Sequence, residues 1–272
     1  MKVSIITDEI SSDPETAIEL ASDWGIRHFE IRGLLGKRVP DVEPQLIDRL
    51  KSIISRYGAE VVAISPGIFK CDIEDQETIK RDLEERLPRS IDLAKELKAG
   101  FIIVFGFHCK DPNNNGYIER AVSALRKASD YAASMGIHLA LENEPQYLAD
   151  TGERTARLLK LVEKDNLHIN WDPCNAYVSG EDPSMGIEHV KETIMHVHLK
   201  DAVIDRRTGK KVYVPLGEGE VNILRQLEKL KMHDYGGFVS IETHISPNKV
   251  KNSQKCWNNL KNLLAKIDEE TK

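Results

Sequence analysis

The stretch Ile194-Met195-His196-Val197-His198-Leu199-Lys200-Asp201 decides how the rest of the chain is interpreted. If it is a β-strand, His196, His198 and Lys200 share one face and three apolar side chains share the other, because strand side chains alternate. Titratable groups on a buried face cost free energy unless that face opens onto a site. We therefore expect this strand to carry functional side chains.

Three other apolar runs in the same half of the chain end in a carboxylate, at Glu142, Asp172 and Glu242. They belong to a longer series in which short apolar runs alternate with amphipathic segments. The predicted strands are 2–7, 28–32, 60–65, 101–107, 137–142, 167–172, 194–200 and 238–243. The predicted helices lie near 14–24, 45–57, 75–97, 117–135, 153–164, 184–193, 222–232 and 250–268.

Eight strand–helix units in one chain of 272 residues favour an α/β fold of the (β/α)8 TIM barrel type. No linker rich in glycine, serine or proline divides the sequence, so we expect a single domain over residues 1–272. No GxGxxG or Walker A motif supports an open, doubly wound sheet instead. Within this pattern, Pro88 predicts a break or kink in its helix, and Thr208-Gly209 predicts a hairpin turn.

The amino-acid composition indicates which kinds of binding partner are unfavourable. The net charge of −6 and the pI near 5.9 argue against nucleic acid and anionic membranes as partners. No apolar run approaches the roughly 20 residues that span a bilayer. The amino terminus lacks the features of a signal peptide, and the four cysteines form no CxxC motif, so we expect a cytoplasmic protein with reduced thiols.

The residues that end four consecutive strands suggest a metal site. In a TIM barrel, functional groups sit at the carboxyl ends of the strands, where Glu142, Asp172, His198 and Glu242 would form one arc. Three carboxylates and one imidazole suit a divalent ion such as Mn²⁺, Mg²⁺ or Co²⁺; Zn²⁺ stays open, although no thiolate completes a structural zinc site. A single acidic residue after a strand is more often a helix cap, as Asp172 before Pro173 could be.

Five motifs in this half of the chain resemble a known family. They are Glu-Asn-Glu at 142–144, Trp-Asp-Pro-Cys-Asn at 171–175, His-Val-His-Leu-Lys-Asp at 196–201, Leu-Gly-Glu-Gly at 216–219 and Ile-Glu-Thr-His at 241–244. Together they resemble the xylose-isomerase-like sugar isomerase/epimerase barrels. This group includes ketose 3-epimerases and inosose dehydratases.

The resemblance implies a role for each of the four strand-end residues. Glu142, Asp172, His198 and Glu242 match the family's metal ligands, and the two glutamates also match its acid/base pair. It implies a metal-dependent epimerase or isomerase that moves a proton next to a ketose carbonyl through an enediolate, most plausibly a ketose 3-epimerase. It also implies a small-molecule sugar as substrate and a homo-oligomer, either a dimer or a tetramer.

Two positions depart from the ketose 3-epimerases. Asn175 stands where those enzymes often have a histidine, and Ile204 stands where they often have an arginine. An inosose-type dehydratase using the same metal site therefore remains open. A non-catalytic sugar-binding barrel and an apurinic-site endonuclease are further alternatives, and the endonuclease is disfavoured because the early strands lack the histidines of its metal cluster.

Four residues are candidates to bind the sugar: Asn175, Lys200, Glu30 and His108. For Lys200 and Glu30, a structural ion pair is the competing interpretation, whereas Asn175 could bond a hydroxyl group. His196 lies deeper on the same face as His198, and we expect it to be a buried core residue. No glycine-rich phosphate loop stands out, which favours an unphosphorylated sugar.

Overall fold

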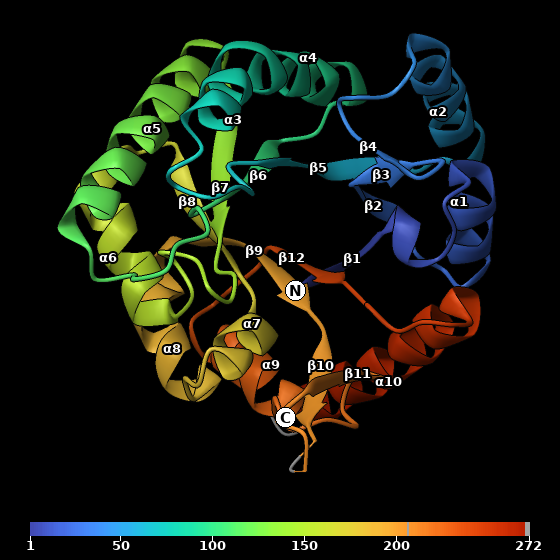
Figure 1. Cartoon of the computed structure of the whole chain (residues 1–272). Helices are drawn as coiled ribbons and strands as arrows, with labels where there is room; N and C mark the ends of the chain where they lie inside the picture. The colour runs from blue at the N-terminus through green and yellow to red at the C-terminus, as the bar shows by residue number, and fades with distance from the viewer. Residues whose placement is uncertain (206, 270–272) are drawn as a thin grey trace.

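Eight parallel strands close into a barrel in the computed structural model, which describes residues 1–205 and 207–269. The strands follow one another around the barrel in chain order (Figure 1). They are β1 (Lys2–Ile6), β2 (His28–Ile31), β5 (Glu60–Ile68), β6 (Phe101–Phe105), β7 (His138–Glu142), β8 (Leu167–Trp171), β9 (Ile194–Leu199) and β12 (Phe238–Ile241). The expected (β/α)8 barrel is thereby confirmed, with β1 closing the ring between β2 and β12.

Helices surround the strands on the outside of the barrel (Figure 1). They are α1 (Pro14–Asp23), α2 (Pro44–Tyr57), α3 (Gln76–Arg81), α4 (Leu87–Leu97), α5 (Asn115–Ser134), α6 (Gly152–Val162), α7 (Pro173–Val178), α8 (Pro183–Val190), α9 (Ile223–Met232) and α10 (Lys249–Glu269). Several begin at an Asp, Asn or Thr whose side chain accepts a backbone N–H of the first turn, such as Asp13 and Thr151. Among the described residues, no helix is long and apolar enough to cross a membrane.

The α-helical segment around Pro88 is interrupted. A π-helical turn, η2 (Asp82–Arg86), joins α3 to α4 just before Pro88, where the sequence predicts a break or kink. The helix is wider in η2 than in an α-helix. Pro88 follows as the second residue of α4, in a first turn, where the missing N–H of proline is tolerated. Asp82 fixes this turn from inside, because its carboxylate accepts Phe69 N at 2.6 Å and Arg86 Nη1 at 2.6 Å.

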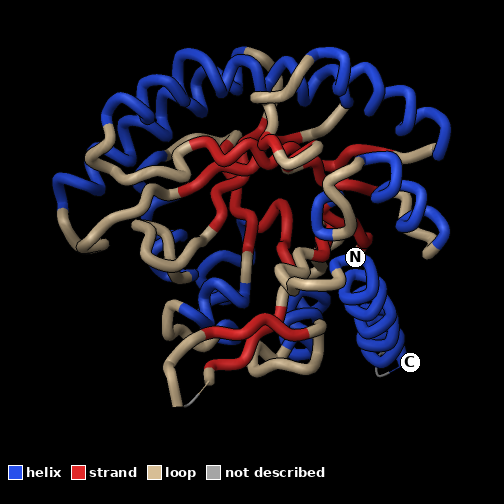
Figure 2. The backbone as a smooth tube through the Cα atoms, turned by 45° about the vertical axis from the view of Figure 1, so that its right-hand side comes forward, coloured by secondary structure: helices blue, strands red, loops and turns tan. Residues whose placement is uncertain are grey.

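Two antiparallel hairpins stand outside the barrel and appear as separate pairs of short strands (Figure 2). The first, β10 (Asp201–Ile204) with β11 (Lys211–Val214), confirms the hairpin expected around Thr208-Gly209. The second, β3 (Gly33–Leu34) with β4 (Lys37–Arg38), is too short to have been predicted from a strand pattern. It directly follows β2 and carries basic residues toward the carboxyl end of the barrel.

Alternation along β6 separates two apolar layers. Ile102 and Val104 pack in the large core between strands and helices, whereas Phe101, Ile103 and Phe105 pack in a smaller cluster with residues such as Ala63 and Ala140. The other inward positions are unusually polar. Buried polar side chains include Ser4, Glu30, Asn170, His196, His198 and Ser240, all on barrel strands.

Close packing between α6 and α8 gives a test of the fold. A Cβ added at Gly152 would lie 2.2 Å from the backbone oxygen of Gly186, so we expect Gly152→Ala to lower the unfolding free energy by about 1–3 kcal/mol. Chemical denaturation measures this. Gly100→Ala is the control, because a Cβ there meets nothing within 4 Å and its effect should stay within about 0.5 kcal/mol. Equal stability of the two variants would contradict the packing described here.

Candidate active site

The four acidic and histidine residues expected at the strand ends all lie at the same end of the barrel. Glu142 is the last residue of β7, Asp172 and Glu242 directly follow β8 and β12, and His198 is next to last in β9. Asp172 also caps α7, since its Oδ1 accepts Asn175 N at 2.8 Å. The helix-cap interpretation is thus confirmed for Oδ1, and the other carboxylate oxygen, Oδ2, faces Lys200 at 2.6 Å.

Donor atoms of Glu142, Asp172, His198 and Glu242 lie within 4.8 Å of one another. His198 Nδ1 is 3.4 Å from Glu142 Oε1 and 3.5 Å from Glu242 Oε2, and all four residues are buried. Such a group of oxygens with one nitrogen could hold a divalent cation. His198 Nδ1 is buried without a hydrogen-bond partner among the described residues, as is expected of a nitrogen kept for a metal.

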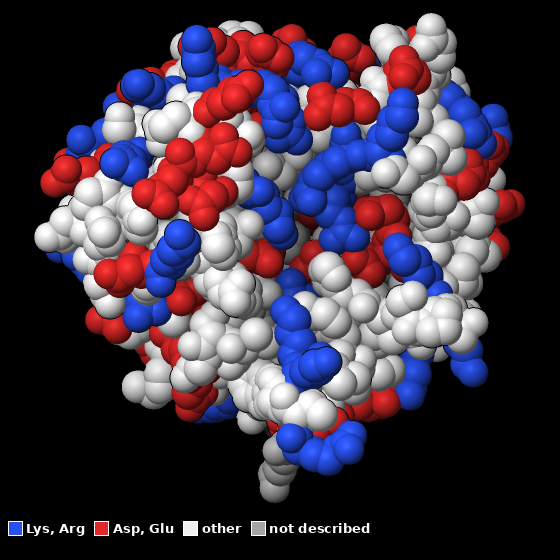
Figure 3. All heavy atoms as spheres, in the orientation of Figure 1, with Lys and Arg blue, Asp and Glu red and all other residues white. Residues whose placement is uncertain are grey.

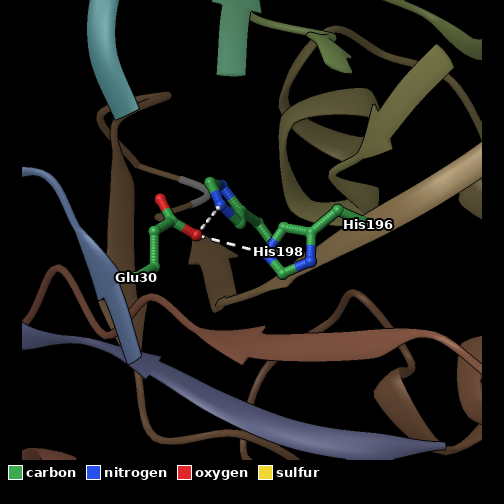
Figure 4. Close-up of side chains that lie close together, drawn as sticks. All are labelled: Glu30, His196 and His198. Carbon is green, nitrogen blue, oxygen red and sulfur yellow. Dashed lines mark hydrogen bonds and ion pairs between the residues drawn. The ribbon is translucent and has the colours of Figure 1, made fainter. Parts of the chain in front are cut away.

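Glu30 fixes His198 from below (Figure 4). Its Oε2 accepts Nε2–H of His198 at 2.9 Å and Nε2–H of His196 at 3.2 Å, and all three side chains are buried. A carboxylate can only accept, so Nε2 of His198 carries a proton and Nδ1 faces the site. Burial opposes ionisation of Glu30, but the two histidines outweigh it and lower its pKa to about 2.

The ammonium group of Lys200 offsets the negative charge of Asp172 and Glu242. Its Nζ lies 2.6 Å from Asp172 Oδ2 and 2.6 Å from Glu242 Oε2, and the side chain is buried. Burial alone would lower the pKa of Lys200, but the facing carboxylates, Asp172 first, raise it well above its usual value. The side chain is thus a permanent cation in the site, and it also lines the cavity described below.

Arg32, directly after β2, adds a second cation. Its guanidinium donates to Glu242 Oε1 at 2.8 Å, to Glu9 Oε1 at 2.6 Å and to Asp8. Against the effect of burial, Lys200 and then His244 and His198 hold the pKa of Glu242 well below its usual range. Glu242 is therefore an anion at neutral pH.

The other two carboxylates differ from each other. Burial raises the pKa of Asp172 to about 6, because repulsion by Glu242 and Glu142 adds to desolvation and Lys200 compensates only in part. For Glu142, the attraction of His198 outweighs burial, so its pKa lies below the usual value. Glu142 and Glu242 are consequently ionised and able to accept a proton.

A cavity of about 170 Å³ opens over these groups. Its lining residues are Arg32, Arg38, Ser65, Lys70, Phe105, Glu142, Glu144, Lys200, Tyr213, Glu242 and His244. Figure 3 shows a hollow at the centre of this face, with acidic side chains inside and basic side chains at its border. A larger hollow of about 420 Å³ lies between α2 and α4, but none of the four strand-end residues lines it.

Three residues expected to bind substrate lie elsewhere. Glu30 is fully buried beneath His198, and Asn175 Nδ2 donates to Asn143 O at 2.8 Å behind Glu142. His108 Nδ1 lies 3.2 Å from Asp72 Oδ2, outside the barrel strands. Within residues 1–205 and 207–269, none of the three lines the cavity, and their direct contact with a sugar stays a prediction. Lys200 is the one member of the predicted set that does line it.

The basic and aromatic residues of the cavity lining were not expected from the sequence. Arg32 could have been found, because it directly follows β2, a position equivalent to that of Glu242 after β12. Arg38, Lys70 and Tyr213 come from a short hairpin, from the segment after β5 and from β11. No strand-end pattern marks those positions.

Comparison with known proteins agrees with this geometry. The sequence model described as a xylose isomerase-like TIM barrel matches residues 18–260. Fructoselysine 3-epimerase of Shigella flexneri is 24% identical over 244 residues, 84% of each chain. The 3-dehydroshikimate dehydratase of Bacillus anthracis is 30% identical over 137 residues, 44% of this chain and 47% of that one. The crystal structure of a D-tagatose 3-epimerase-like protein, 22% identical, superposes over 100% of both chains with a TM-score of 0.81.

Proposed function

The chain belongs to the xylose isomerase-like TIM barrel family, and from this premise we propose that it is a divalent-metal-dependent sugar epimerase that acts by proton transfer beside a ketose carbonyl. The convergence of two ionised carboxylates, Glu142 and Glu242, on one cavity carries this proposal. They come from β7 and β12, which β8 and β9 separate in the barrel, so they approach the cavity from two sides. A 3-epimerase is the favoured reaction, in keeping with the name of the Shigella relative.

The proposed metal ligands are Glu142, Asp172, His198 and Glu242. The fit rests on the donor set and on the buried, unpartnered Nδ1 of His198, whose opposite nitrogen is held by Glu30. Mn²⁺, Mg²⁺ or Co²⁺ match three carboxylates and one imidazole best. A cation bound there supplies Lewis acidity, polarising the ketose carbonyl and the neighbouring hydroxyl so that the adjacent C–H becomes acidic.

The side chains of the site perform the proton transfers. One of the two glutamates removes the proton from the carbon beside the carbonyl, and the other returns a proton from the opposite face, which inverts that carbon. Lys200 and Arg32 keep Glu242 ionised between turnovers through the contacts described above. Because the two glutamates lie close together, their titrations are coupled and a pH–rate profile reports the pair.

A dehydratase is the second candidate. The match to 3-dehydroshikimate dehydratase and the presence of Asn175, where ketose 3-epimerases often have a histidine, both favour it. The same proton abstraction would then be followed by loss of a hydroxyl group from the neighbouring carbon. An enone or dicarbonyl product absorbs in the near ultraviolet, whereas an epimer does not, so a spectrum of the reaction mixture separates the two.

Hydrogen exchange tests the proposed chemistry. We expect the Mn²⁺-loaded protein in heavy water to introduce deuterium beside the carbonyl of at least one ketose in a panel, measured by NMR. Glu142→Gln and Glu242→Gln should each lower the rate by about 10²- to 10⁴-fold, because a base is lost. Glu85→Gln, on an exposed side chain of η2, is the control. Absence of exchange with every ketose would refute proton transfer as the reaction.

Asp172→Asn tests the ligand set. Asparagine still caps α7 but carries no charge, so folding should be retained while Mn²⁺ binding weakens by at least about 10-fold. Isothermal titration calorimetry measures the affinity, and circular dichroism checks the fold. A folded variant that binds Mn²⁺ as tightly as the unchanged protein would exclude Asp172 as a ligand.

Glu30→Gln tests the support of His198 from below. The amide keeps the shape of the side chain but weakens the orientation and basicity of His198, so we expect Mn²⁺ affinity to fall by about 10- to 100-fold. The same calorimetric titration measures this, with Glu85→Gln again as the control. Unchanged affinity would mean that Glu30 only fills the barrel interior.

A further inference from the structure

Arg38 is the cation of the cavity that no carboxylate neutralises. The lining contains four basic side chains, and three of them have a carboxylate within 4 Å: Arg32, Lys70 and Lys200. Among residues 1–205 and 207–269, Arg38 has no such partner. A half-buried guanidinium without a counter-ion is costly, because desolvation is not offset by an ion pair.

The position of the Arg38 guanidinium is nevertheless well defined. Nε donates to the backbone oxygen of Ser65 at 3.1 Å, and Nη2 donates to Ser65 Oγ at 3.2 Å. A Cβ at residue 67 would lie 2.9 Å from Nε, so Gly67 leaves the space that the guanidinium occupies. These contacts use two of its five N–H groups. Burial and the nearby Arg32 lower the pKa of Arg38, as expected for a cation without a close anion.

Lys70 lies at the same cavity and extends the basic side. Its Nζ is 4.4 Å from the centre of the Phe105 ring and 3.1 Å from Glu144 Oε2. The lining as a whole carries four cations and three carboxylates, Glu142, Glu144 and Glu242. Arg32 and Lys200 are also paired with carboxylates outside the lining, Asp8, Glu9 and Asp172, so among the described residues Arg38 is the lining cation left without an ion pair.

We propose that the substrate carries an oxyanion substituent, a carboxylate or a phosphate, which Arg38 binds while the carbonyl end of the molecule faces Glu142 and Glu242. The planar guanidinium can bind either oxyanion in a bidentate manner, by donating two parallel N–H···O hydrogen bonds. Only the placement of the substrate carbonyl near Glu142 and Glu242 rests on the proposed function. A phosphate would depart from the expectation of an unphosphorylated sugar, whereas a carboxylate would agree with it.

Three compounds of one carbon skeleton test the proposal: D-fructose, D-fructuronate and D-fructose 6-phosphate. They differ only at C6, which bears a hydroxyl, a carboxylate or a phosphate ester. We expect the Mn²⁺-loaded protein to bind at least one of the two anions at least 10-fold more tightly than fructose, as measured by calorimetry. The anion that binds more tightly shows whether the site prefers a carboxylate or a phosphate.

Variants of Arg38 assign the preference to this residue. Arg38→Gln should weaken binding of the preferred anion by about 10- to 100-fold and leave fructose unchanged, whereas Arg38→Lys should retain part of the preference as a point charge. Arg120→Gln, on the exposed side of α5, is the matched control and should behave like the unchanged protein. Circular dichroism checks that each variant is folded.

The results separate this proposal from the proposed function. Equal affinity for the three compounds, no binding of either anion at millimolar concentration, or an equal effect of Arg38→Gln on all three would overturn the oxyanion subsite. Anion binding that depends on Arg38 without deuterium exchange for any ketose would support the subsite and count against proton transfer. Exchange of fructose as fast as that of its two anionic analogues would support proton transfer and overturn the subsite.

Discussion

The contact of Lys200 with both Asp172 and Glu242 is the interaction on which the site depends. Three carboxylates buried at one end of a barrel repel one another, and burial favours their neutral forms. A single ammonium 2.6 Å from two of them, together with Arg32 on Glu242, allows charged groups to remain there. The arrangement is costly to assemble, because each buried charge loses its hydration.

The barrel provides the rigid frame for these charges. The closed barrel brings Glu142 and Glu242, about a hundred positions apart along the chain, together at the same end. The barrel interior below the strand ends is also polar, because Glu30 on β2 hydrogen-bonds His196 and His198 on β9. The two carboxylates of the proposed acid/base pair are thus held at the carboxyl ends of strands.

The sequence predicted the frame better than the cavity. Apolar runs with period and length suited to buried strands located all eight barrel strands, and the strand-end carboxylates and His198 were brought together as expected. The depth of Glu30 was not predictable, because alternation tells the face of a strand but not the depth within the barrel. Asn175 lies on α7, where strand alternation gives no information. Arg38 and Lys70 were missed for another reason: short irregular segments place them, and such segments carry no periodic signal.

The β3–β4 hairpin has a consequence for how such a protein diversifies. It inserts Arg38 into the cavity from outside the barrel, and it contacts the strands without belonging to their hydrogen-bonded ring. If Arg38 binds a substituent of the substrate as proposed, replacements in this hairpin would change that preference while Glu142 and Glu242 stay in place on the barrel. Selection could then change substrate recognition and the reaction itself independently of each other.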